Sequence, residues 1–151
     1  SDLNMPDIAA AIGLAQFRKY ESHILPRRKE IFERYSQAFA SCSWAVNPVY
    51  RTTDKISSYH VFPLRIKDCS AEQRNQIISE IAEKDVTVNV HFKPIPLLSF
   101  YKNLGYNEKE YPIALKNYEQ EISLPVYFDL SDIHVQMVID AVTSAVKKVI
   151  G

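Results

Sequence analysis

Residues 86–92 read Val-Thr-Val-Asn-Val-His-Phe and alternate between apolar and polar side chains. Successive side chains of a β-strand point to opposite faces, so this period of two predicts a strand with one buried and one polar face. The buried face would carry Val86, Val88, Val90 and Phe92, and the polar face Thr87, Asn89, His91 and Lys93. Pro94 and Pro96 end the strand, since proline cannot donate a hydrogen bond to a sheet.

Two further extended segments flank this strand in the sequence. Residues 59–66 alternate with the same period, and their apolar face would carry His60, Phe62, Leu64 and Ile66. Pro63 lies within this strand, so the strand is predicted to be at an edge or locally unpaired there. Residues 122–125 form a short apolar strand, whereas residues 41–58 are predicted to be irregular.

Helices are predicted between and around the strands. Ser70 and Gln73 have capping-box spacing and start a helix over residues 71–84, whose buried side includes Arg74. Pro26 is predicted to interrupt the helical pattern, because proline disfavours a helical residue before it. Other helices are expected over residues 7–17, 27–40 and 112–120, and from Ser131 to the end of the chain. Strands separated by helices favour an α/β fold with a small sheet.

Composition excludes several classes of function. The chain has 151 residues, and 18 basic side chains balance 18 acidic ones, so no strong field would attract nucleic acid or an anionic membrane. Three glycines cannot build a glycine-rich phosphate loop. Neither the two cysteines nor the four histidines have the spacing of metal ligands, and no apolar run reaches the ~20 residues of a membrane helix. We therefore expect no metal, no nucleic acid, no membrane and a cytoplasmic location.

The polar face of residues 87–93 is the best candidate site that the residues themselves offer. It combines an amide, an imidazole and an ammonium group, although a solvent-facing side of an antiparallel sheet would look the same. Asn4 precedes the first predicted helix, where it would either help to bind a phosphate or simply cap the helix. These residues alone leave the function open.

Five stretches change this, because they occur in one order and spacing that is typical of a known family. They are NMPDIAAAIGLAQ at 4–16, SYHVFP at 58–63, VHFKPIP at 90–96, FYKNLGY at 100–106 and EISLP at 121–125. Together they resemble the C-terminal portion of the DegT/DnrJ/StrS-type sugar aminotransferases, and the resemblance covers essentially the whole chain. Such enzymes use pyridoxal 5'-phosphate (PLP) to move an amino group from glutamate to a nucleotide-linked keto sugar, for surface polysaccharide or glycan biosynthesis.

The resemblance implies a fold and a division of the chain. It implies the small C-terminal domain of a fold-type-I PLP enzyme, which is α/β (α+β-like), with a small, mostly antiparallel sheet packed with helices and an N-terminal helical segment. Residues 1–41 would link to and pack on a large domain that precedes this sequence, and residues 42–151 would form the small domain. Family members are homodimers, so a homodimer is expected. The small-residue helix at 8–17 predicts dimerisation or helix rearrangement of the isolated chain.

The resemblance also suggests site residues. Asn4 matches a position near the cofactor phosphate, and His91 matches a histidine on the sugar-nucleotide side of the cleft, with Lys93 and Asn89 beside it as substrate-binding residues. Asp2 stands where the family often has asparagine, and Pro96 stands where many members have a second histidine.

The family's Schiff-base lysine has no counterpart here, so no catalytic residue can be nominated. The 151-residue chain alone is therefore expected to be inactive and to bind no PLP. Two alternatives stay open: a non-catalytic binding or interaction module with the same fold, and a PLP-dependent sugar dehydratase relative.

Overall fold

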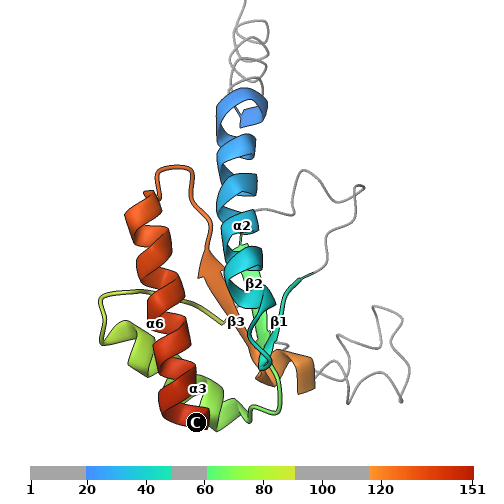
Figure 1. The fold of residues 1–151 in the computed structure, drawn as a ribbon, viewed down its shortest axis with the longest axis vertical. Helices are drawn as coiled ribbons and strands as arrows, with labels where there is room; N and C mark the ends of the chain where they lie inside the picture. Colours follow the sequence, from blue (N-terminus) through green and yellow to red (C-terminus); the bar gives the residue numbers. More distant parts are fainter. Residues whose placement is uncertain (1–19, 49–60, 91–115) are drawn as a thin grey trace, which may run out of the picture.

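The computed structural model describes residues 20–48, 61–90 and 116–151 as helices packed on a small antiparallel sheet (Figure 1). The elements in chain order are η1 (Tyr20–Ile24), α2 (Leu25–Ala40), β1 (Ala45–Val46), β2 (Val61–Ile66), α3 (Ala71–Ala82), β3 (Glu121–Pro125) and α6 (Asp132–Ile150). A helical turn at residues 116–119 precedes β3. This arrangement confirms the predicted fold class. The predicted helix at 7–17, Tyr59, His60 and residues 91–115 lie outside the described residues.

The sheet has the strand order β1-β2-β3, and both pairs are antiparallel. Residues 86–90 approach the free side of β3 through one bridge, in which Asn89 N donates to Ser123 O at 3.2 Å and Ser123 N donates to Asn89 O at 2.7 Å. Val86 and Val88 are buried while Thr87 and Asn89 are exposed, so the predicted alternation is confirmed over the described part of this segment. β1 falls in residues predicted to be irregular, and that prediction is wrong at Ala45 and Val46.

Pro63 shows how the sheet accommodates a proline. β2 is the central strand, but β1 pairs only with Ile66 and Arg65 and does not reach Pro63. Ser123 lies opposite Pro63, but its backbone N–H and C=O groups form hydrogen bonds with Asn89 and not with Pro63. Pro63 therefore interrupts no ladder hydrogen bond of the described strands, although β2 is central and the register pairs Pro63 with Ser123.

The core lies between one face of the sheet and the helices. Phe62 is fully buried, and its ring centroid lies 4.6 Å from that of Phe32, 5.3 Å from that of Tyr35 and 6.3 Å from that of Phe39. These three partners all come from one side of α2. α6 adds a row of small and branched side chains: Val135, Val138, Ala141, Val142, Ala145 and Val146. The closely packed aromatic cluster fixes α2 against β2.

Local sequence signals set most helix boundaries. Ser70 Oγ accepts a hydrogen bond from Gln73 N, and Gln73 Oε1 accepts one from Ser70 N, so the predicted capping box is confirmed. Buried Arg74 donates to Tyr118 O at 2.8 Å, which supplies the partner that its position requires.

The predicted break at Pro26 is wrong. Ile24 is helical, and η1 leads directly into α2. Pro26 lies in the first turn of α2, directly after the π-helical η1, so its missing N–H falls where the helical hydrogen-bond pattern changes.

Candidate functional site

The sheet face that points away from Phe62 carries a group of polar side chains, and we call this the outer face. Its residues are Thr87 and Asn89 on one strand segment, Glu121, Ser123 and Pro125 on β3, and Val61, Pro63 and Arg65 on β2. The strand pairing places Asn89 opposite Ser123, and Glu121 opposite Arg65. Directly opposed Cβ atoms in such pairs lie about 4.5–5.5 Å apart and diagonal ones about 7–8 Å apart. The pairing therefore places Glu121 next to both Arg65 and Asn89 on the outer face, with Arg65 and Asn89 on opposite sides of β3.

Asn89 is the one predicted site residue within the described ranges. Two backbone hydrogen bonds to Ser123 hold it in place, and its side chain is exposed, as the predicted polar face requires. Asn4, His91 and Lys93 lie outside the described residues, so their roles stay predictions. Thr87 is also exposed and lies on the same face as Asn89, two residues earlier.

Glu121 and Arg65 were not predicted as site residues. Arg65 donates to Gln120 Oε1 at 3.1 Å, and Gln120 is buried. Burial raises the pKa of the Glu121 carboxyl group above its ordinary value, and the nearby Arg65 guanidinium offsets only part of this effect. Both residues are charged and stand beside apolar strand residues: Arg65 lies between Leu64 and Ile66, and Glu121 directly precedes Ile122. A charge in such a position could have indicated them from the sequence.

A cavity of about 180 Å³ lies where β3 ends, beside the start of α6. Its lining residues are Asp85, Val86, Thr87, Pro125, Tyr127, Leu130, His134, Met137 and Val138. Asp85 adopts a left-handed conformation with a φ of 59°, which turns the chain from α3 into the extended segment. Thr87 lines this cavity and also belongs to the outer face, so the cavity adjoins the outer face. Its lining residues come from separate segments that a loop brings together, so this cavity could not be predicted from the sequence.

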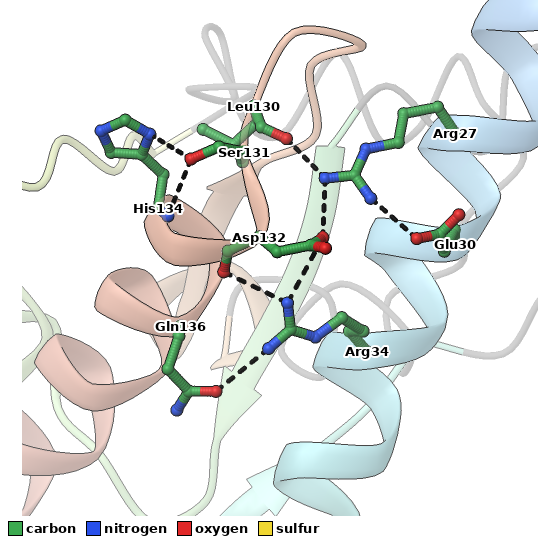
Figure 2. Close-up of polar contacts among 8 residues, drawn as sticks. All are labelled: Arg27, Glu30, Arg34, Leu130, Ser131, Asp132, His134 and Gln136. Atoms are coloured by element: carbon green, nitrogen blue, oxygen red, sulfur yellow. Dashed lines mark hydrogen bonds and ion pairs between the residues drawn. The ribbon is translucent and has the colours of Figure 1, made fainter.

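An ion-pair cluster fixes the start of α6 next to this cavity (Figure 2). Arg27 Nη2 lies 3.0 Å from Asp132 Oδ1 and donates to Leu130 O at 2.6 Å. Arg34 Nη1 lies 3.5 Å from the same carboxylate oxygen, and Arg34 Nη2 donates to Gln136 Oε1 at 3.1 Å. Both arginines come from α2, so α2 positions the loop that precedes α6.

Ser131 caps α6 within the same cluster. Its Oγ accepts a hydrogen bond from His134 N at 3.2 Å and lies 2.7 Å from His134 Nδ1 (Figure 2). This second contact fixes the orientation of the imidazole ring that lines the cavity.

The described part of the chain contains neither a cluster of metal-ligating side chains nor a helix suited to a membrane. No group of three or more His, Cys, Asp or Glu side chains there could hold a metal ion. None of the helices in those ranges is both long and apolar enough to cross a membrane.

Known proteins are similar to this chain in sequence. The spore coat polysaccharide biosynthesis protein SpsC of Bacillus subtilis is 32% identical over 148 residues, which make up 96% of this chain and 38% of SpsC. A UDP-4-amino-4,6-dideoxy-N-acetyl-beta-L-altrosamine transaminase of Campylobacter jejuni is 29% identical over 149 residues, with the same shares.

A solved structure agrees with these relatives. Spr1654 of Streptococcus pneumoniae, described as a sugar aminotransferase, superposes in its PLP form with a TM-score of 0.76 and 41% identity, over 95% of this chain and 36% of that one. The chain thus spans less than two fifths of the length of the relatives that it matches. Residues 1–143 match the family model itself, and the chain belongs to the DegT/DnrJ/EryC1/StrS aminotransferase family.

Proposed function

We propose that this chain forms the substrate side of a PLP-dependent aminotransferase. The reaction would move an amino group from glutamate to the keto carbon of a nucleotide-linked sugar, for the biosynthesis of a surface polysaccharide or glycan. The observation that carries this proposal is the family match over residues 1–143. The names of the relatives support the sugar and polysaccharide parts of it.

The proposal assigns binding roles to residues of this chain. Asn89, His91 and Lys93 would bind the nucleotide sugar, because an amide both donates and accepts hydrogen bonds while imidazole and ammonium groups donate them. The exposed position of Asn89 on the outer face supports its part in this. Asn4 would contact the cofactor phosphate.

PLP, when bound, supplies the electron sink that amino-group transfer requires. The described residues do not fit the role of its lysine. The lysines in those ranges, at positions 29, 67, 84, 116, 147 and 148, are all exposed. Two of them are engaged elsewhere: Lys84 donates to Ser144 Oγ at 2.6 Å, and Lys148 pairs with Glu80 at 2.8 Å. We therefore assign no cofactor chemistry to the described residues.

The proposal extends to domains and assembly. Residues 1–41 would link the small domain at 42–151 to a large cofactor-binding domain, and the enzyme would act as a homodimer in the cytoplasm. The extent of the relatives beyond this chain supports the presence of such a domain.

Isotope transfer tests the proposal. The complete polypeptide that contains these residues would be incubated with PLP, ¹⁵N-glutamate and a panel of nucleotide-linked keto sugars. The masses of the products would be measured by mass spectrometry. We expect a ¹⁵N-amino sugar from the complete polypeptide and none from the 151-residue chain.

The other outcomes of this experiment contradict the proposal in different ways. A product that has lost oxygen without gaining nitrogen would indicate the sugar dehydratase reaction. A complete polypeptide that shows no absorption band of bound PLP would indicate a non-catalytic module.

A further inference from the structure

Glu121 and Arg65 occupy a position that links them to the proposed substrate site. They lie directly opposite each other on β3 and β2, and Glu121 lies diagonally across from Asn89, two residues along β3 from Ser123. All three side chains belong to the outer face. The two backbone hydrogen bonds between Asn89 and Ser123 fix the position of the extended segment at 86–90 against β3.

The carboxylate of Glu121 is only partly stabilised where it lies. Burial raises its pKa, and the attraction of Arg65 is too weak to reverse this. Within the described residues, the Arg65 guanidinium donates to Gln120 Oε1 at 3.1 Å. A surface ion pair of the same molecule, Lys148 with Glu80, closes to 2.8 Å. The Glu121 and Arg65 pair therefore differs from an ordinary structural ion pair, and a carboxyl group perturbed in this way is typical of a functional site.

We propose that Glu121 and Arg65, together with Asn89, bind hydroxyl groups of the sugar ring on the outer face. This inference rests on the proposed function and adds to it the residues that recognise the sugar rather than the nucleotide. A carboxylate accepts, a guanidinium donates, and an amide does both, which matches neighbouring hydroxyl groups that each donate and accept. A diphosphate would be repelled by Glu121, and an apolar ligand would offer these polar groups no hydrogen bond in place of the water it displaces.

Binding measurements on the complete polypeptide can test this inference. Calorimetry would compare UDP-glucose with UDP, and dTDP-glucose with dTDP, for the wild type, for Glu121→Gln and for Glu119→Gln. Glu119 is a matched control because it is also a half-buried glutamate, but it lies on the helical turn before β3.

The expected result is selective for the sugar. Glu121→Gln should weaken binding of the nucleotide sugar about tenfold through loss of a charge-assisted hydrogen bond, and leave the affinity for the free nucleotide unchanged. Arg65→Lys should show the same selectivity, because an ammonium group cannot replace the planar donor pair. Glu119→Gln should bind both ligands as the wild type does.

Three outcomes would overturn the inference. Glu121→Gln and Arg65→Lys could both bind nucleotide sugar as tightly as the wild type, or both could lose sugar and nucleotide affinity equally. In either case the proposed function would stand. If the wild type binds none of the four ligands, the proposed function fails and the inference fails with it. Circular dichroism melting of each variant separates these results from misfolding, since Glu121→Gln keeps the shape of the side chain.

Discussion

At the scale of single residues, Tyr35 and Glu121 show two ways in which this fold treats a polar group at the sheet. Tyr35 is fully buried on the helix side, and its hydroxyl group donates to Pro125 O at 2.8 Å. Burial raises its pKa far above the ordinary range, so the group stays neutral and acts as a hydrogen-bond donor. Glu121, on the outer face, is near Arg65, whose attraction offsets only part of the effect of burial on its pKa.

Tyr35→Phe should destabilise the chain by about 1 kcal/mol or slightly more, because it removes a hydrogen bond and leaves the Pro125 carbonyl group without that donor. Urea unfolding followed by circular dichroism would measure the free energy of unfolding. Tyr127→Phe is the control, since Tyr127 is 51% exposed and should change nothing. Equal stability of Tyr35→Phe and the wild type would show that this hydrogen bond contributes little.

The raised pKa of Glu121 predicts a pH-dependent stability. The folded state binds this proton more tightly than the unfolded state, so the contribution of Glu121 to the free energy of unfolding falls as pH rises from about 4.5 through its folded-state pKa. Glu121→Gln removes this loss. The variant should therefore melt at a higher temperature than the wild type at pH 7, and the difference should shrink towards pH 4.

Melting curves at both pH values, with Glu119→Gln beside them, would check this. A Glu121→Gln variant that is less stable than the wild type at pH 7 would mean that the carboxylate stabilises the fold, contrary to the direction of its pKa shift.

At the scale of elements, α3 depends on a local signal at its start. The reciprocal hydrogen bonds between Ser70 and Gln73 satisfy backbone and side-chain groups at both positions of the capping box. Ser70→Ala should therefore cost about 1 kcal/mol of stability. Ser79→Ala, within the same helix and exposed, is the matched control and should be neutral or slightly stabilising because alanine favours helices. Urea unfolding would measure the free energy of unfolding of both variants. Equal changes in Ser70→Ala and Ser79→Ala would contradict a stabilising role of the Ser70 cap.

Elements that depend on local signals could be predicted from the sequence, and those that depend on distant partners could not. The capping box predicted the start of α3, and Ser131 with the valines of the last helix predicted α6. Both predictions succeed because a cap and a helical period depend only on residues that are close in the sequence. β1 has two residues and exists through its pairing with Arg65 and Ile66. Pro26 was misread because a proline in the first turn of a helix resembles one that ends a helix.

The candidate site divides in the same way. The polar alternation of residues 86–92 predicted that Asn89 lies on an exposed face. The approach of Glu121 and Arg65 to Asn89 depends on the register between three segments, and the cavity beside Tyr127 depends on a loop and on the ion pairs of Asp132. Neither can be obtained from one segment alone.

At the scale of the whole molecule, the described residues form one hydrophobic core between the sheet and the helices. It belongs to an aminotransferase family but spans less than two fifths of the relatives that it matches. Large apolar side chains, Tyr127, Phe128, Ile133 and Met137, are exposed around the loop before α6 and along its first turns. The predicted association through the helix at 8–17 lies outside the described residues and stays a prediction.

The most direct test is a crystal structure of the complete polypeptide with PLP and a nucleotide-linked sugar bound. We predict that the sugar ring lies on the outer face, with its hydroxyl groups within hydrogen-bond distance of Asn89 and Glu121. A structure in which the nucleotide sugar is bound and the outer face contacts no part of it would contradict the assignment of this chain as the substrate side of the enzyme.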